Sequence, residues 1–236
     1  TSNATHHWHA STREHTTEVS EKGEHTYTNG ICICGMREMV LIPAGTFQMG
    51  STKGNSNNTP VHDVTITRPF YIGKYEVTQP EYEKYCSYGE NKPNSRDGIG
   101  ENHPAYYVCW YDALVYCNKR SIAEGLTPCY KINNSTNPDD WGDTPDSKSH
   151  ENLASWETVA CDFTANGYRL PTSDEWVYAA SGGNVLFGTQ YTYAGSDIID
   201  EVAWYKDNSG SKAHEVKGKK PNGLGLYDMS GNVQEW

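Results

Sequence analysis

The segment Gly225–Trp236 combines glycines, oxygen-bearing side chains and aromatic rings in one short stretch. Gly231 and Asn232 tolerate left-handed backbone conformations, so the segment is expected to turn sharply instead of continuing as a helix or strand. Asp228 and Glu235 supply carboxylates, and the carbonyls between them can point at the same centre. Calcium takes about 6–8 oxygen ligands of these kinds. Spacing alone nevertheless favours a solvated acidic turn, because acidic residues near glycine are common in loops.

The aromatic composition explains how a chain this polar can still form a core. Seventeen tyrosines and seven tryptophans stand beside only four phenylalanines in 236 residues. Tyr and Trp rings pack while their polar tips find hydrogen-bond partners. The length suits one large domain or a domain with a tail. We therefore expect an ordered chain with an amphipathic aromatic core.

Charge and hydropathy exclude several classes of function. The formal net charge of −11 argues against a nucleic-acid partner, because binding phosphates requires a basic surface. No run approaches the roughly 20 apolar residues of a membrane-spanning helix, so direct membrane insertion is not expected. A nucleotide cofactor has no support either, because the chain holds no Gly-rich phosphate loop that opens a helix.

The cysteines do not define a zinc site or a disulfide framework. They are odd in number and lack a repeated C-x-x-C pair, so at least one thiol stays unpaired and the redox compartment is left open. We expect Cys109, Cys117 and Cys129 to be core thiols. The seven positions are Cys32, Cys34, Cys86, Cys109, Cys117, Cys129 and Cys161.

Residues 1–35 are predicted to be a polar tail or linker, followed by a folded domain over residues 36–236. The tail is rich in Thr, Ser, His and Glu and has little apolar periodicity to bury. Its histidines, His6, His7 and His9, lack a fixed geometry and are given no function.

Short strands are expected at the start of the domain. Met39–Gly50 is predicted to form two strands around a Pro-Ala-Gly turn. The segments Val64–Thr67 and Phe70–Val77 are dense in β-branched and aromatic residues and predict a second pair.

Three helices follow from capping signals. Thr78 and Glu81 form a T-x-x-E capping box, and Thr172 with Glu175 repeats it. A further helix is expected over about residues 111–124, with Gly125 as its stop.

An insertion is predicted at about residues 133–160. It is rich in Asn, Asp, Ser and Pro, and Trp141 and Trp156 are the expected anchors. A connection this long is expected to be an ordered surface loop.

Together these segments resemble the formylglycine-generating enzyme (sulfatase-modifying factor) family. The resemblance covers roughly residues 39–236 and implies an α+β, C-type-lectin-like fold of short strands, few helices and long loops. Periodicity alone predicts only α+β. The motifs that carry the resemblance are IPAGTFQMG at 42–50, YIGKYEVT at 71–78, YRLPTSDEW at 168–176 and GLYDMSGNV at 225–233.

The resemblance favours calcium over the solvated turn. It implies a calcium site formed by the side chains of Asp228 and Glu235 and the carbonyls of Gly231 and Val233. A second family site near Glu201 finds no clear acidic ligands in this sequence and is not carried over.

The resemblance does not extend to catalysis. The family's copper-binding, substrate-oxidising cysteine pair lies downstream of the position matching Trp236, so no catalytic residue is assigned. We therefore predict a non-catalytic recognition protein on a calcium-stabilised scaffold, displaying a diversified C-terminal surface as in the similar variable proteins of diversity-generating retroelements. The alternative is a copper-dependent oxidoreductase of the formylglycine-generating type, whose cysteine segment lies beyond Trp236.

The expected partner is a protein or another surface ligand, and the expected location is extracellular or in the cell envelope. Tyrosine-rich loops suit versatile binding, because Tyr offers a large contact area at low entropic cost. The same rings also build cores of this kind. From sequence, Tyr106, Tyr107, Tyr191 and Tyr193 are as suited to packing as to contacting a ligand.

Overall fold

The computed structural model describes residues 37–50, 60–145, 153–182 and 191–236, together with the backbone of strands between residues 6 and 32. The chain divides into two compact units. The first, here called the strand unit, comprises Thr1–Glu76, Ser173–Trp204 and Val216–Gly231. The second, the helix unit, comprises Val77–Thr172, Tyr205–Glu215 and Asn232–Trp236.

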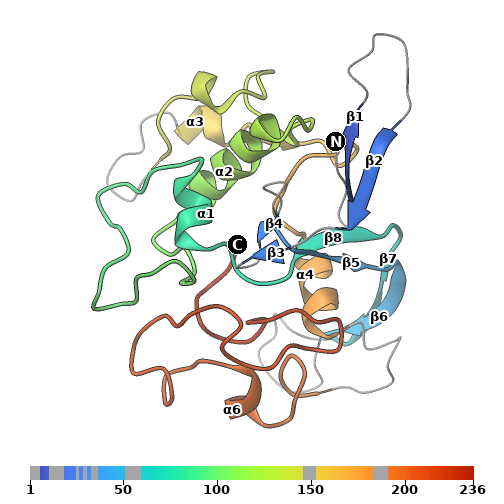
Figure 1. The fold of residues 1–236 in the computed structure, drawn as a ribbon, viewed down its shortest axis with the longest axis vertical. Helices are drawn as coiled ribbons and strands as arrows, with labels where there is room; N and C mark the ends of the chain where they lie inside the picture. The colour runs from blue at the N-terminus through green and yellow to red at the C-terminus, as the bar shows by residue number, and fades with distance from the viewer. Residues whose placement is uncertain are drawn as a thin grey trace. The chain divides into compact units, whose positions relative to one another are not determined.

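Two nested antiparallel strand pairs lie in the strand unit between Met39 and Gly73 (Figure 1). β5 (Met39–Ile42) pairs with β8 (Phe70–Gly73), and β6 (Gly45–Met49) pairs with β7 (His62–Ile66). The two strands predicted around the Pro-Ala-Gly turn therefore exist, and each finds its partner further along the chain.

The strand prediction for Phe70–Val77 was too long at its end. β8 stops at Gly73, and the Lys74 amide donates to the carbonyl of Glu38. Four residues later Thr78 begins a helix, so the chain leaves the ladder to form the helix cap. The T-x-x-E signal prevails over the strand propensity of Tyr75 and Val77.

Helix α4 (Ser173–Ala180) packs against β6 and β7 in the strand unit (Figure 1). Tyr178 is fully buried, and its ring centroid lies 5.1 Å from that of Phe47. A Cβ at Gly45 would lie 2.4 Å from the Tyr178 hydroxyl oxygen, so only glycine fits at this position. Ile42, Ile66, Leu226 and Met229 complete this core.

The helix unit begins with α1 (Gln79–Glu83), and its capping box is present as predicted. The Thr78 amide donates to Glu81 Oε2 at 2.9 Å. α2 (Trp110–Ala123) follows and ends as expected, since Gly125 has a φ of 70° and the Leu126 amide returns to the carbonyl of Ser121.

The insertion is anchored by the two predicted tryptophans. Trp141 and Trp156 are both buried, and their rings meet edge to face at 5.5 Å. They belong to the helix-unit core with Tyr82 and Leu114. Residues 146–152 of the insertion lie outside the described residues. Its short elements are β9 (Tyr130–Lys131), η2 (Pro138–Asp140), α3 (Leu153–Trp156) and β10 (Ala160–Cys161), with β9 paired to β10.

Residues 6–32, predicted to be a polar tail, contain four short strands. β1 (His6–Ala10) pairs with β2 (Val19–Glu24), and β3 (Tyr27–Thr28) pairs with β4 (Ile31–Cys32). The remaining helix, α6 (Ile199–Val202), is a single turn in the strand unit. Among the described residues no helix is long and apolar enough to cross a membrane.

The expectation of core thiols holds for two of three cysteines. Cys117 and Cys129 are buried, and neither is disulfide-bonded. Cys109 is only partly buried, because it occupies the N-cap of α2, where its amide donates to Asp112 Oδ2 at 3.0 Å. This correction follows from the helix beginning one residue earlier than predicted.

Candidate recognition surface

Two of the predicted calcium ligands lie in the strand unit. The carboxylate of Asp228 is buried, and its Oδ2 accepts a hydrogen bond from the Lys217 amide at 2.8 Å. Burial raises the pKa of Asp228, while the Lys217 amide and ammonium partly offset the effect. Gly231 has a φ of 88° and bridges to Trp204, which confirms the predicted sharp turn.

The other two predicted ligands lie in the helix unit, where Val233 is half-buried and Glu235 is exposed. Within the described part of the chain, no group of three His, Cys, Asp or Glu side chains is arranged to hold a metal ion. The predicted set needs only two carboxylates beside backbone carbonyls. Asp228 suits it, because a buried carboxylate is stabilised in its charged form by a nearby cation.

Asn232, which the sequence identified only as a turn residue, has a specific structural role in the helix unit. Its Oδ1 accepts from the His214 amide at 2.8 Å, and its Nδ2 donates to the His214 carbonyl at 3.1 Å. His214 lies outside any strand, and its ring Nε2 is 2.8 Å from the Ser209 carbonyl oxygen. A Gly-Asn pair signals a turn but not the partner of the side chain, so sequence reasoning missed this contact.

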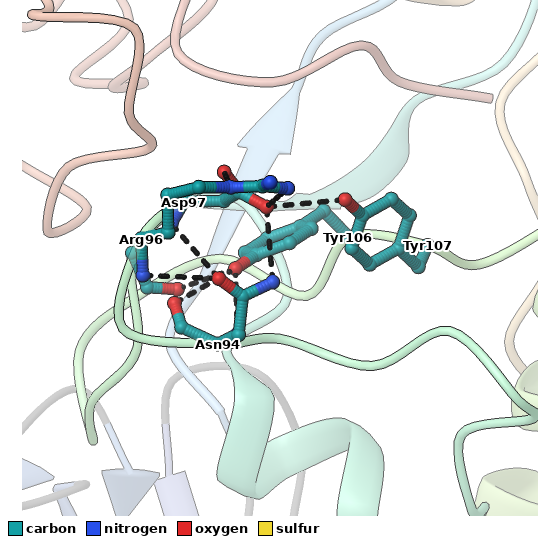
Figure 2. Close-up of polar contacts among 6 residues, drawn as sticks. Asn94, Arg96, Asp97, Tyr106 and Tyr107 are labelled. Atoms are coloured by element: carbon teal, nitrogen blue, oxygen red, sulfur yellow. Dashed lines mark hydrogen bonds and ion pairs between the residues drawn. The ribbon is translucent and has the colours of Figure 1, made fainter.

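The loop over residues 94–107 is ordered by side chains that converge on Asp97 (Figure 2). Arg96 forms a bidentate pair with it, with Nε to Oδ1 at 2.7 Å and Nη2 to Oδ2 at 2.8 Å. Asn94 Nδ2 and the Tyr107 hydroxyl both donate to Oδ2, at 2.9 and 3.2 Å. These hydrogen bonds, the one from Arg96 first, hold the pKa of Asp97 well below its usual range.

Asn94 closes the start of the same loop. Its Oδ1 accepts from the amides of Arg96 and Asp97, which is an Asx-type turn. Tyr106 locks the other end, because its hydroxyl accepts from the Asn94 amide and donates to the Gly98 carbonyl at 2.8 Å. The Asn-Ser-Arg-Asp-Gly sequence carries a recognisable turn signal that could have located this loop.

The loop is joined to the segment that carries the Asn232 contact. The Ala213 amide donates to the Asp97 carbonyl at 2.8 Å, and Ala213 directly precedes His214. Hydrogen bonds thus connect the family motif at Asn232 to the loop over residues 94–107 within the helix unit.

Four large side chains are presented from this region. Tyr107 has a φ of 60° and is 49% exposed, and Ile99 is also exposed. Trp236 is exposed as well, and its Nε1 donates to the carbonyl of Val108 at 2.8 Å. Arg96 is exposed too. We call these four side chains the recognition surface: Arg96, Ile99, Tyr107 and Trp236. The sequence did not decide whether Tyr106 and Tyr107 pack in the core or contact a ligand. In the structure the Tyr106 hydroxyl is hydrogen-bonded to the backbone, and Tyr107 is exposed.

Residues 33–236 match the Sulfatase-modifying factor enzyme 1-like domain, and the chain belongs to this family. The α+β fold with short strands, few helices and long loops is the fold of the family, as predicted.

Individual relatives have different roles. The Chaperone protein LppX of Paenibacillus barcinonensis is 40% identical over 84% of this chain and 70% of its own length. The solved structure of Treponema denticola variable protein 1 matches with a TM-score of 0.68 and 35% identity, covering 84% of this chain and 71% of that one. The Formylglycine-generating enzyme of Mus musculus is 28% identical over 89% of this chain, which spans 60% of that enzyme.

Proposed function

We propose that this chain is a non-catalytic recognition module that binds a protein ligand through the recognition surface. The observation that carries the proposal is the loop over residues 94–107, which presents Arg96 and Tyr107 from a frame fixed by side-chain hydrogen bonds. Arg, Tyr and Trp are the residue types that dominate binding energy at protein interfaces. A loop ordered before binding loses less conformational entropy on association.

The state of the thiols supports a non-catalytic role. Burial is the main cause that raises the pKa of Cys86 and Cys109 to about 11 and of Cys117 to about 12. The thiolate is the reactive and metal-binding form of cysteine. These three side chains are therefore protonated at neutral pH and are poorly suited to bind copper or attack a substrate.

Similarity to a variable protein supports the recognition role and a diversified C-terminal surface. Trp236 places a large ring beside the loop over residues 94–107, through its hydrogen bond to Val108. An extracellular or cell-envelope location belongs to the same proposal, and the similarity to the Chaperone protein LppX supports it weakly.

Calcium is proposed as a structural ion of this module. Asp228, Gly231, Val233 and Glu235 would hold it, with two carboxylates and two carbonyls. The ion would supply charge compensation for the buried Asp228 and tie the motif segment to the fold. It takes no part in a reaction.

Photo-crosslinking tests the recognition role directly. Benzoylphenylalanine would replace Tyr107 in one variant and Tyr71 in another, because these rings have matched exposure of 49% and 47%. Each variant is irradiated on intact cells and envelope fractions of the source organism. We expect a discrete protein adduct from position 107 only, whose affinity for the purified partner then falls in Tyr107→Ser. Equal labelling from both positions, or no loss in Tyr107→Ser, would refute the proposal.

The copper-dependent oxidoreductase remains the second candidate, because the mouse enzyme shares 28% identity with this chain. It requires a cysteine pair outside residues 1–236. Copper(I) binding and oxidation of a cysteine-containing peptide by the natural full-length protein test it. Stoichiometric copper with peptide oxidation would favour the enzyme over the recognition module.

A further inference from the structure

The helix unit contains a polar cavity that the proposed recognition role does not use. It has a volume of about 450 Å³ and lies among α1, α2 and the segment that follows η2. A volume of this size is typical of sites for small molecules. The side chains used in the argument are Tyr82, Cys86, Asp112, Lys119, Asp139 and Asp143, all of which line it.

Tyr82 places a hydroxyl at this cavity. The residue is 4% exposed and belongs to the cavity lining. Its ring is fixed against Tyr88 and Tyr116, with centroids 4.8 and 5.8 Å away. A hydroxyl held in a fixed position at a cavity can accept from or donate to a polar ligand.

Asp112 supplies a preorganised acceptor in the same cavity. Its Oδ2 accepts from the Cys109 amide at 3.0 Å, and its Oδ1 accepts from the Thr144 hydroxyl at 2.9 Å. Each carboxylate oxygen has a second lone pair, so both can accept from a ligand while these bonds persist. The carboxylate is thus fixed in orientation and still open to a donor.

The charges on the lining residues indicate the sign of the charge that a ligand of this cavity would carry. Lys119 Nζ lies 3.3 Å from Asp139 Oδ1, which pairs the one cation of the lining with one carboxylate. The lining therefore carries more carboxylates than cations, with Asp112 and Asp143 beyond the Lys119–Asp139 pair. The field of the whole chain, at a net charge of −11, also attracts cations.

We propose that this cavity binds a small free organic amine, with the ammonium group donating to Asp112 and the Tyr82 hydroxyl. Burial, followed by the neighbouring Asp112 and Cys86, raises the pKa of Tyr82, so its phenol stays neutral and its oxygen can accept an N–H. Asp143 and the Lys119–Asp139 pair surround the remainder of the ligand.

Calorimetric titration with putrescine tests the proposal, and 1,4-butanediol serves as the neutral probe of equal length. We expect saturable binding of putrescine that weakens with added salt, and no binding of the diol. Asp112→Asn keeps one acceptor oxygen and removes the charge, and Tyr82→Phe removes only the hydroxyl. Each should lower putrescine affinity by about tenfold, the scale of a hydrogen bond to a charged group.

Two matched variants control for indirect effects. Tyr88→Phe alters the ring that packs on Tyr82 without touching the cavity lining, and Glu157→Gln removes an exposed carboxylate elsewhere in the insertion. Both should bind putrescine like the parent chain. If Asp112→Asn fails to fold, the exposed Asp143→Asn takes its place. Equal binding of the diol, or unchanged affinity in both Tyr82→Phe and the Asp variant, would overturn the proposal.

Discussion

Asn232 and His214 exchange two hydrogen bonds: the His214 amide donates to Asn232 Oδ1 at 2.8 Å, and Asn232 Nδ2 donates to the His214 carbonyl at 3.1 Å. The Asn232 side chain thereby satisfies both backbone groups of His214, as a neighbouring strand does in a sheet. His214 follows Ala213, whose amide donates to Asp97. The arrangement links the family motif to the loop over residues 94–107 without a sheet.

Asn232→Ala is expected to lower the free energy of unfolding by about 1–3 kcal/mol, because it removes two hydrogen bonds to half-buried backbone groups. Asn232→Gly is the control for backbone strain, since Asn232 has a φ of 60° that glycine adopts freely. We expect both variants to speed hydrogen exchange at the His214 amide. Exchange unchanged in the glycine variant would show that strain, and not the lost hydrogen bonds, explains the effect.

Calcium is expected to raise the melting temperature of the parent chain but not that of Asp228→Asn. The amide can still accept from Lys217, so this variant removes the charge and retains the contact. Binding to the folded state alone stabilises by about 2.7 kcal/mol at a hundredfold excess over Kd. Asp207→Asn, an exposed carboxylate, should respond like the parent. An equal calcium response in Asp228→Asn would rule this residue out as a ligand.

Asp228 also gives a pH test with a definite sign. Its pKa is raised in the folded state by burial, so the folded chain holds the proton to higher pH than the unfolded chain does. The associated stability is complete below the unfolded pKa of about 3.9 and is lost as pH rises through the folded pKa. Calcium favours the charged carboxylate, so saturating calcium should remove this loss. Chemical denaturation at several pH values, with and without chelator, measures it.

Modification rates test the protonated state of the thiols. Burial raises the pKa of Cys86 and Cys109 from 9.0 to about 11, which reduces the thiolate fraction at pH 8 by about 100-fold. Iodoacetamide should therefore label both far more slowly in the folded chain than in urea. The folded rate should rise about tenfold per pH unit until pH 11, as followed by mass spectrometry. Fast labelling of either thiol at pH 7 would contradict a raised pKa at that position.

The helix caps and buried anchors could be predicted from sequence because each depends on a local signal. Thr78 with Glu81, Gly125 and Trp156 all act through near neighbours or a large apolar surface. Strand pairing could not be predicted, since propensity shows that Met39–Ile42 is extended but not that it pairs with Phe70–Gly73.

The candidate site likewise has one part that the sequence predicts and another that it does not. The sharp turn at Gly231 was visible in its glycine, whereas the loop around Asp97 depends on contacts that only the folded chain brings together. Tyr107 and Ala213 reach Asp97 from distant positions in the sequence. The sequence therefore carries a turn signal for the loop of the recognition surface, but no pattern that distinguishes an exposed tyrosine from a buried one.

The packing of Gly45 against Tyr178 yields a double-mutant test of the strand unit. Gly45→Ala places a methyl 2.4 Å from the Tyr178 hydroxyl oxygen and should cost about 1–3 kcal/mol of stability. Tyr178→Phe alone should cost little, because this hydroxyl is buried without a hydrogen-bond partner among the described residues. In the double variant the oxygen that collides with the methyl is gone, so most of the Gly45→Ala loss should be recovered. Urea unfolding of the four proteins gives the coupling free energy directly. Additive losses would mean that the methyl is rejected by something other than the Tyr178 hydroxyl, and that α4 does not approach β6 as closely as the structure requires.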